Sequence, residues 1–409
     1  MKPQILFLAH RIPYPPNRGD KMRSWHLIRH LGRFATVHLA AFADDEADAA
    51  HLPALREAMG GALGEAFVDP IRRNRFAWAA RALVRREPLA VTAFHGRAMQ
   101  RFVARIIAER PIAAAVGFSV QMAQFVPANR RFPFVMDFCD FDSAKYAQYS
   151  ATGLLRDLVF KREAVRLLAF EKKAATHADV GLFVSDVEVD LFRKAGAPAG
   201  ADLRTLANGI DMDFYDAAAG FARLAPAPDG PLIVFTGQMD YRPNVDAVVG
   251  FALDVLPRVH AVRPDVRFAI VGRKPVPAVT ELADLDGVIV TGEVDDVRPW
   301  LAAAALVVTP LKVARGVQNK VLEAMAMARP VVASTGAFLG IDAEPGRDLI
   351  VADGPEAQAE AVLGLLADEG RAREIGRAAR RRMEDGYSWD AQLAPLAAML
   401  GLAGRRDAA

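Results

Sequence analysis

The residues best suited to bind a phosphorylated ligand lie in the run LVVTPLKVARGVQNKVLEAMAMARPVVAS. An apolar strand and a loop are expected first, and a helix is expected to begin near Val317, just after Gly316. The free N–H groups at a helix N-terminus bind anions, and Lys320 adds an ammonium group within one turn. Glu323 offers a carboxylate that can accept hydrogen bonds from a pair of ribose hydroxyls. This pattern favours a nucleoside diphosphate as ligand, although a solvated helix could carry the same residues.

Glycines follow several of the expected strands, where they let the backbone approach a phosphate. Gly19 follows the first strand, and Gly237 and Gly272 follow the first two strands of the second half. Many such turns are only structural. None of the three glycines belongs to a G-x-G-x-x-G run, so the sequence disfavours a nicotinamide-dependent dehydrogenase.

Three carboxylates, Asp137, Asp140 and Asp142, follow an apolar run in the first half. A carboxylate beside a ligand can accept the proton of an attacking hydroxyl, and Asp140 is the residue that we favour for this role. The same aspartates could instead cap the next helix. His10, at the end of the first expected strand, is an alternative proton acceptor, whereas His26 falls inside a helical pattern and is expected to be structural.

Two α/β sheets are needed to position these residues. Short apolar strands are expected at 5–9, 37–41, 113–118, 134–137, 180–184 and 203–207 in the first half, and at 232–235, 266–271, 288–291, 306–309, 330–334 and 348–351 in the second. Helical patterns separate the strands, which predicts two doubly wound parallel sheets. Ligands of such sheets bind beyond the carboxyl ends of the strands. We therefore expect two Rossmann-like domains that face each other across a cleft.

The length of 409 residues also fits two domains. The run AAAGFARLAPAPDG is rich in Ala, Pro and Gly and has no periodicity, which predicts a linker. We expect a first domain at 1–215, a linker at 216–231 and a second domain, which holds the nucleotide-binding pattern, at 232–387. A C-terminal helix at 388–409 is expected to pack back toward the first domain.

The composition is that of a folded globular chain, with 52% hydrophobic and 24% charged residues. No apolar run approaches the roughly 20 residues of a membrane span, so we expect neither an anchor nor a signal peptide. Cys139 is the only cysteine, which excludes an internal disulfide, and no Cys/His spacing is typical of a zinc site. These features favour a cytoplasmic location.

The net charge of +2 hides a basic first half and an acidic second half. Residues 1–208 hold 30 Lys/Arg against 21 Asp/Glu, whereas residues 209–409 hold 21 against 28. Two basic amphipathic stretches, Arg72–Arg86 and Arg156–Lys173, could contact an anionic membrane surface or could be solvated helix faces. No base-stacking or helix-turn-helix pattern accompanies the charge, which disfavours nucleic acid as a partner.

Ordered motifs along nearly the whole chain resemble GT-B glycosyltransferases of the large retaining family that builds bacterial lipopolysaccharide, exopolysaccharide and mannosylated glycolipids. They are HADVGLFVSDVEVDLFR, LANGIDMDFY, VFTGQMDYRPNVDAV, FAIVG, VIVTGEVDDVRPWLAAAALVVTPL, VLEAMAMARPVVAS and YSWD. AHRIPYPPNRGDKMRSWHLIRHLG and MDFCDFDSAKYAQYS, with ARGVQNKVLEAMAMARPVVAS, further resemble the subgroup of sugar transferases associated with exosortase, or PEP-CTERM, exopolysaccharide systems.

The resemblance implies a retaining, metal-independent transfer of a sugar from a nucleoside diphosphate sugar to a lipid-linked oligosaccharide, without a cofactor and at the inner face of the cytoplasmic membrane. It implies that Lys320 and Arg242 neutralise the leaving diphosphate and that Asp140 acts on the acceptor. It assigns the donor to Gly19, Gly237, Gln238, Gly272, Gly292, Val294, Arg315, Gly316, Val317, Asn319, Lys320 and Glu323.

Two positions depart from the family pattern. Arg315 stands where the family has the first glutamate of a pair, which usually contacts the donor sugar. The family usually has an arginine and, a few residues later, a lysine that both face the diphosphate. Here these positions align with Gln238 and, approximately, with Pro243. The first departure leaves open a non-catalytic subunit that binds nucleotide sugars. The fold also leaves open a nucleotide-sugar epimerase.

Overall fold

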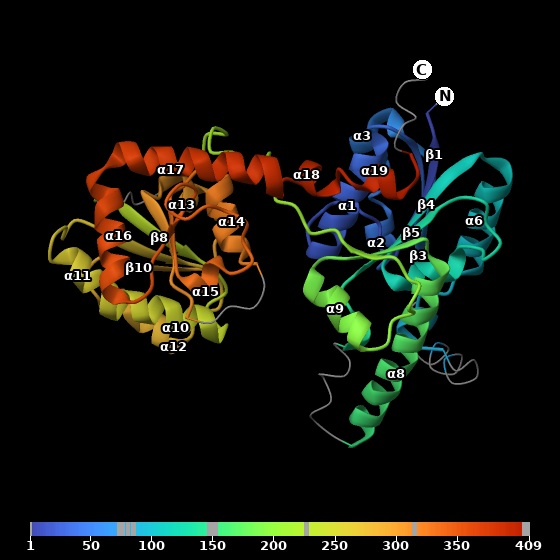
Figure 1. Ribbon diagram of the computed structural model, residues 1–409, viewed down its shortest axis with the longest axis horizontal. Coiled ribbons are helices and arrows are strands. Elements are labelled where there is room, and N and C mark those ends of the chain that lie inside the picture. The colour runs from blue at the N-terminus through green and yellow to red at the C-terminus, as the bar shows by residue number, and fades with distance from the viewer. Residues whose placement is uncertain are drawn as a thin grey trace. The chain divides into compact units, whose positions relative to one another are not determined.

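The computed structural model describes residues 2–71, 78, 82, 87–144, 154–224, 229–312 and 317–402, without the side chains of 154–158. The chain forms two compact units. The N-terminal unit comprises Met1–Asn208 and Gln392–Ala409, and the C-terminal unit comprises Gly209–Ala391. Figure 1 shows both units, with many of their elements labelled.

The N-terminal unit is built on a parallel sheet with the strand order β3-β2-β1-β4-β5-β6-β7. The strands are β1 (Gln4–Ala9), β2 (Thr36–Ala43), β3 (Leu63–Pro70), β4 (Ile112–Phe118), β5 (Phe134–Cys139), β6 (Val180–Phe183) and β7 (Leu203–Thr205). Strand β1 pairs with β2 on one side and β4 on the other, so that Ile5 to Ala9 are completely buried. A central strand with both faces covered explains this unbroken apolar run.

Helices cover the sheet of the N-terminal unit. They are α1 (Gly19–Gly32), α2 (Glu46–Ala49), α3 (Leu52–Met59), α5 (Leu89–Thr92), α6 (Arg97–Glu109), α8 (Leu154–His177), α9 (Asp186–Lys194) and α19 (Leu396–Met399), with 3₁₀ helices at Gly60–Ala62 and Val120–Phe125. Helix α19 is drawn in red among the blue and green elements of this unit (Figure 1), because residues from Gln392 onward belong to it.

The C-terminal unit has a parallel sheet with the strand order β10-β9-β8-β11-β12-β13. The strands are β8 (Leu232–Thr236), β9 (Arg267–Val271), β10 (Val288–Gly292), β11 (Leu306–Thr309), β12 (Val331–Ala333) and β13 (Ile350–Val351). The helices are α10 (Arg242–Gly250), α11 (Leu256–His260), α12 (Pro277–Thr280), α13 (Arg298–Ala303), α14 (Asn319–Ala326), α15 (Thr335–Phe338), α16 (Pro355–Ala367) and α17 (Glu369–Arg382). A 3₁₀ helix spans Glu281–Asp284, π-helical turns span Phe251–Val255 and Met383–Tyr387, and α18 (Trp389–Leu393) spans the boundary at Ala391.

The predicted α/β class with two Rossmann-like parallel sheets is confirmed. Strand β3 is a difference, because no strand was expected at Leu63–Pro70. It lies at the edge of its sheet and is only partly buried beyond Leu63, so its sequence contains Gly64, Glu65 and Asp69 instead of a continuous apolar run. Without that run, periodicity does not reveal the strand.

The chain passes from the first unit to the second at Asn208, ahead of the expected linker at 216–231. The segment after this point packs within the C-terminal unit: Ile210 forms a β-bridge with Ser388, and the Arg380 guanidinium donates to the carbonyl oxygens of Met212 and Tyr215. Residues 225–228 of the expected linker lie outside the described residues.

The two basic stretches are described only in part. Within Arg72–Arg86 the structure describes Trp78 and Ala82, and in α8 the side chain of Arg156 lies outside the described residues. The Arg162 guanidinium donates to the carbonyl oxygens of Ala82 and Glu87, so this cation binds the protein's own backbone. Among the described residues, no helix has the length and apolar character needed to cross a membrane.

Candidate functional site

A cavity of about 630 Å³ opens at the carboxyl ends of β8 and β9 in the C-terminal unit. We call it the C-terminal pocket. Its lining comes from the strand ends, the start of α10, the loop after β10 and the first turns of α14. The lining residues are Tyr215, Thr236, Gly237, Gln238, Asn244, Val271, Gly272, Arg273, Glu293, Val294, Val297, Asn319, Lys320 and Glu323. Ligands of doubly wound sheets bind at this edge.

The structure brings together seven of the residues assigned to the donor: Gly237, Gln238, Gly272, Val294, Asn319, Lys320 and Glu323. Gly292 ends β10 and Val317 is exposed, and neither is among the lining residues. Arg315 and Gly316 lie outside the described residues. Gly19 belongs to the other unit, where it begins α1.

Arg242 does not line the C-terminal pocket, although it was expected to face the diphosphate. Its side chain is 86% exposed, and its guanidinium donates to the Asp246 carboxylate one turn along α10. The arginine in the lining is Arg273, whose guanidinium donates to the Gln238 side chain over 3.1 Å. Sequence reasoning missed Arg273, although it directly follows the glycine at the end of β9.

The glycines at the ends of β8 and β9 have a packing role. A Cβ atom on Gly272 would lie 1.6 Å from the Gly237 carbonyl oxygen. Only glycine therefore lets these two strand ends approach so closely. A Cβ atom on Gly237 would in turn lie 3.0 Å from the Lys320 ammonium nitrogen, so any side chain there would crowd the cation of the pocket.

Lys320 supplies a largely desolvated positive charge to the C-terminal pocket. Its ammonium donates to the Asn244 side-chain oxygen over 2.5 Å and lies 4.3 Å from the centroid of the Phe235 ring. Burial lowers the pKa of Lys320 to about 8, although the nearby Glu323 carboxylate acts in the opposite direction. An anion that enters the pocket would stabilise the charged form of this lysine.

Glu323 lies one turn further along α14, and the Tyr215 hydroxyl donates a hydrogen bond to its carboxylate. Burial raises the pKa of Glu323, while the hydrogen bond from Tyr215 and the charge of Lys320 act against this shift. Burial, followed by the charge of Glu323, raises the pKa of Tyr215, which keeps its hydroxyl protonated as a donor.

Two arginines fix the backbone of the segment that carries Tyr215. Arg380 donates to the Tyr215 carbonyl oxygen and to the carbonyl oxygen of Ala326, on the helix that bears Glu323. Arg298 donates to the Phe214 carbonyl oxygen and lies 3.7 Å from the centroid of the Phe214 ring. These contacts hold Tyr215 against Glu323, a partner that sequence reasoning missed because the two residues are far apart in the chain.

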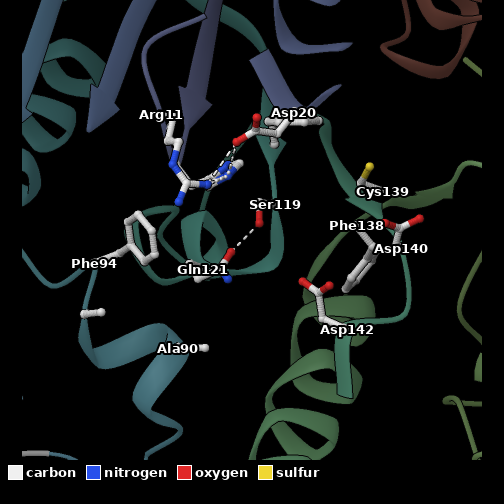
Figure 2. Close-up of a pocket in the computed structure, with 13 residues that line it drawn as sticks. Arg11, Asp20, Ala90, Phe94, Ser119, Gln121, Phe138, Cys139, Asp140 and Asp142 are labelled. Carbon is white, nitrogen blue, oxygen red and sulfur yellow. Dashed lines mark hydrogen bonds and ion pairs between the residues drawn. The ribbon is translucent and has the colours of Figure 1, made fainter. Parts of the chain in front are cut away.

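A second cavity, of about 450 Å³, lies in the N-terminal unit at the carboxyl ends of β1, β4 and β5. We call it the N-terminal pocket (Figure 2). Its lining residues are His10, Arg11, Asp20, Ala90, Ala93, Phe94, Phe118, Ser119, Gln121, Phe138, Cys139, Asp140 and Asp142. Asp140 lies directly after β5 and Asp142 begins the helical residues 142–144, and the Ser119 hydroxyl donates to the Gln121 side chain. The favoured proton acceptor Asp140 is thus a pocket residue.

The charged groups at one side of the N-terminal pocket pair with one another. Arg11 donates to the carboxylates of Asp20 and Asp44, over 2.9 and 2.8 Å, and Arg18 contacts the same two aspartates. Burial alone would raise the pKa of Asp20, but the hydrogen bond with His10 and the charges around it hold that pKa well below its usual range. Asp20 is therefore ionised at neutral pH.

The third carboxylate, Asp137, is not among the lining residues of the N-terminal pocket and has a structural role. It is completely buried and accepts from Arg23 over 2.9 Å, while Arg23 also donates to the Leu206 carbonyl oxygen and the Asn208 side chain. Its other carboxylate oxygen accepts from the backbone N–H of Cys139, a residue with a positive φ of 66°. Asp137 thus holds the strained turn from which the pocket residues Asp140 and Asp142 project.

Among the described residues, no group of three or more His, Cys, Asp or Glu side chains is placed to hold a metal ion. The expectation that the reaction needs no metal and no cofactor remains a prediction.

A family model matches part of the C-terminal unit. Residues 230–368 match the family of glycosyl transferases group 1. That stretch contains both Lys320 and Glu323. The chain is also 32% identical, over 248 residues, to an alpha-maltose-1-phosphate synthase of Mycolicibacterium smegmatis. The match covers 54% of this chain and 62% of that protein, so the chain spans less than two thirds of the length of this curated relative.

Two solved structures resemble the chain over nearly its whole length. Anabaena HepE in complex with UDP matches with a TM-score of 0.57 and 16% identity, covering 97% of this chain and 99% of that one. WaaG, a glycosyltransferase involved in lipopolysaccharide biosynthesis, matches with a TM-score of 0.54 and 17% identity, covering 98% and 100%. At such low identity these likenesses show the fold, which is GT-B.

Proposed function

We propose that the chain is a glycosyltransferase, which moves a sugar from a nucleoside diphosphate sugar to a hydroxyl of a saccharide acceptor. The observation that carries this proposal is the C-terminal pocket, where Lys320 and Glu323 of one helix meet Arg273 beside the paired glycines. This arrangement lies within the stretch that matches glycosyl transferases group 1. A solved neighbour, Anabaena HepE, contains UDP.

Each group in the C-terminal pocket has a task in this reaction. The bond between the anomeric carbon and the diphosphate oxygen breaks, and its electron pair goes to the diphosphate. Lys320 and Arg273 neutralise the charge that develops there, in a site that is partly shielded from water. Glu323 accepts hydrogen bonds from the ribose hydroxyls, held in place by the Tyr215 hydroxyl.

The N-terminal pocket fits the acceptor. Its aromatic side chains and its uncharged polar groups suit a sugar ring with its hydroxyls. The acceptor oxygen forms the new bond to the anomeric carbon and releases its proton to a carboxylate, for which we propose Asp140.

Calorimetric titration with UDP, GDP and their glucose and mannose conjugates tests the donor half of the proposal. At least one of these should bind the wild-type protein, and Glu323→Gln should weaken that binding by about tenfold, the effect of one charged hydrogen bond. Asp246→Asn, in the same unit but paired with the exposed Arg242, is the matched control and should bind like wild type. Binding of NAD(H) without binding of any nucleotide sugar would contradict the proposal.

Product analysis separates transfer from the alternatives. A transferase forms a new glycoside only when an acceptor is present, an epimerase converts the nucleotide sugar without one, and a non-catalytic subunit binds the nucleotide sugar unchanged. We expect the first outcome. We further propose that the acceptor is lipid-linked, that the pathway is exopolysaccharide synthesis of the exosortase-associated kind, and that the anomeric configuration is retained.

Two further measurements test the stereochemistry of the transfer and its metal dependence. Proton NMR of the product reports whether the anomeric configuration is retained, and activity in excess EDTA should equal activity in magnesium if no metal is needed.

We propose that the protein is cytoplasmic and contacts the membrane surface through Arg72–Arg86 and Arg156–Lys173. We expect the protein to sediment with anionic vesicles but not with vesicles of phosphatidylcholine, which carry no net charge.

A further inference from the structure

His10 lies directly after β1 and lines the N-terminal pocket, with only 7% of its surface exposed. Its Nδ1 atom is buried and has no hydrogen-bond partner among the residues that the structure describes. A buried polar atom without a partner costs about 1–3 kcal/mol, and such atoms in native proteins call for an explanation. A ligand in the pocket would supply the missing partner.

The surroundings of the ring determine what Nδ1 can offer that ligand. An Arg11 guanidinium nitrogen lies 2.9 Å from Nε2, and a guanidinium can only donate. Of the two contacts of Nε2, the one with Arg11 is shorter than the one with Asp20, and on that geometry we assign the acceptor role to Nε2 and the single proton of the neutral ring to Nδ1. The Asp20 carboxylate lies 3.3 Å from the same Nε2 and would be its partner if that nitrogen carried a proton.

Burial lowers the pKa of His10, and the charge of Arg11 acts in the same direction. The hydrogen bond and the charge of Asp20, on α1, and the charge of Asp142, at the start of the helical residues 142–144, act against the shift without reversing it. The ring is therefore mainly neutral at pH 7, with an Nδ1–H group as a buried donor.

The other groups of the pocket define the class of ligand. The imidazole lies 5.8 Å from the Phe94 ring and 5.5 Å from the Phe118 ring, and the carboxylates of Asp140 and Asp142 line the same cavity. These carboxylates would repel a phosphate or a carboxylate. A hydroxyl fits both kinds of group, because its oxygen can accept from Nδ1–H while its proton is donated to an aspartate.

We propose that His10 binds a hydroxyl of the acceptor sugar, with Nδ1–H donating to the hydroxyl oxygen and the hydroxyl donating to Asp140 or Asp142. The phenyl rings beside the imidazole pack against the apolar edge of the sugar. The name acceptor rests on the proposed function, whereas the sugar site itself rests on the N-terminal pocket alone.

Two substitutions at His10 separate ligand binding from a structural role. An asparagine amide can place an N–H group near the position of Nδ1, whereas a glutamine amide reaches the position of Nε2. We expect His10→Gln to raise the KM for methyl and octyl glycosides of glucose, mannose and galactose by about tenfold, and His10→Asn to raise it much less. If His10 served only to hold Arg11 and Asp20, the order would be reversed.

Nucleotide binding and a control variant accompany these kinetics. Both His10 variants should bind UDP or GDP like wild type, because the C-terminal pocket lies in the other unit. His51→Gln, which changes an exposed histidine of the N-terminal unit, should leave the KM unchanged. Equal KM values for wild type and His10→Gln would overturn the proposal.

Measurements on the wild-type protein remain decisive if both variants misfold. Long-range proton–nitrogen NMR spectra should show the His10 proton on Nδ1 at neutral pH, and saturation-transfer NMR should show binding of a glycoside from the same panel. A neutral ring protonated on Nε2, or failure of every glycoside to bind, would overturn the inference. If nucleotides still bind in that case, the donor half of the proposed function stands. If no nucleotide binds while a glycoside does, the proposed function fails and the sugar site remains.

Discussion

The two pockets lie at equivalent edges of their sheets, but they differ in whether their charged side chains form ion pairs. In the N-terminal pocket, Arg11 and Asp20 belong to a network in which opposite charges neutralise one another. In the C-terminal pocket, Lys320 takes part in no salt bridge among the described residues and lies against an amide and a phenyl ring. A buried cation without a bound counter-charge favours an anion, whereas a neutralised network favours an uncharged polar ligand. This difference in charge pairing is consistent with the proposed function, in which the C-terminal pocket binds the diphosphate and the N-terminal pocket binds the sugar.

The largest expected effect comes from breaking a neutral pair in the N-terminal unit. Arg23→Met leaves the completely buried Asp137 carboxylate without its cation, which should lower the free energy of unfolding by about 3–5 kcal/mol. Urea unfolding of the full chain measures this loss. Arg242→Ala, which removes an exposed ion pair, is the control and should change little. Equal urea midpoints for Arg23→Met and wild type would show that the buried pair does not stabilise the unit.

A second buried acid makes the stability of the N-terminal unit depend on pH. Burial raises the pKa of Glu171 to about 7, although Ser143 donates two hydrogen bonds to it. The folded state then holds the proton more tightly than the unfolded state, whose carboxyl has the ordinary pKa of 4.5. The free energy of unfolding should therefore fall by up to about 3 kcal/mol as the pH rises from 4.5 to 7.

Glu171→Gln isolates this contribution, because the amide does not titrate. Urea unfolding between pH 4.5 and 8 should show a flatter pH dependence in the variant than in wild type. The same slope in both proteins would contradict the raised pKa of Glu171.

Removing the cation of the C-terminal pocket should weaken nucleotide binding. Lys320→Met should lower the affinity for UDP or GDP by about 10- to 100-fold, the range for a hydrogen bond to a charged group. Because the pKa of Lys320 in the protein without nucleotide is about 8, the affinity of the wild type for the nucleotide should also fall as the pH rises through 8. Calorimetry from pH 7 to 9.5 measures both effects. The variant should lose this pH dependence, and a variant that kept it would exclude Lys320 as its source.

The smallest expected effect concerns the orientation of Glu323. Tyr215→Phe removes the hydroxyl that donates to the Glu323 carboxylate, so the pKa of Glu323 should rise further and its hold on the ribose should weaken. We expect the preference for UDP over 2′-deoxy-UDP to shrink by about fivefold. Tyr241→Phe, at an exposed tyrosine outside the pocket, is the matched control. An unchanged preference in Tyr215→Phe would show that the tyrosine does not position the carboxylate.

The sequence predicts the sheets well because their strands are buried on both faces. The runs that became β1, β8 and β11 are continuous and apolar, and all three lie inside their sheets. Strand β3 escaped prediction because an edge strand tolerates glycine and acids. The strand pattern therefore reveals the interior of a sheet better than its edges.

The candidate site was predictable where its residues share one helix. Lys320 and Glu323 stand three positions apart on α14, so helical periodicity places both in one pocket. Arg242 was expected to replace cations of the family pattern that are absent at Gln238 and Pro243, but in the structure its side chain pairs with Asp246 and is exposed. Arg273 and Tyr215 come from other elements, and only the folded chain brings them to the same cavity.

Because the residues from Gln392 onward belong to the N-terminal unit, one unit is continuous in sequence and the other is not. The C-terminal unit is one uninterrupted piece of chain, Gly209–Ala391, inserted into a unit made of two pieces. A fragment of those residues can be expressed as a single polypeptide, whereas the N-terminal unit needs both of its pieces. Deletion of the residues after Ala391 should therefore destabilise the N-terminal unit, which loses its second piece, and leave the C-terminal unit unchanged. Hydrogen exchange on such a truncated protein would show increased opening in β1 to β7 and unchanged protection in β8 to β13.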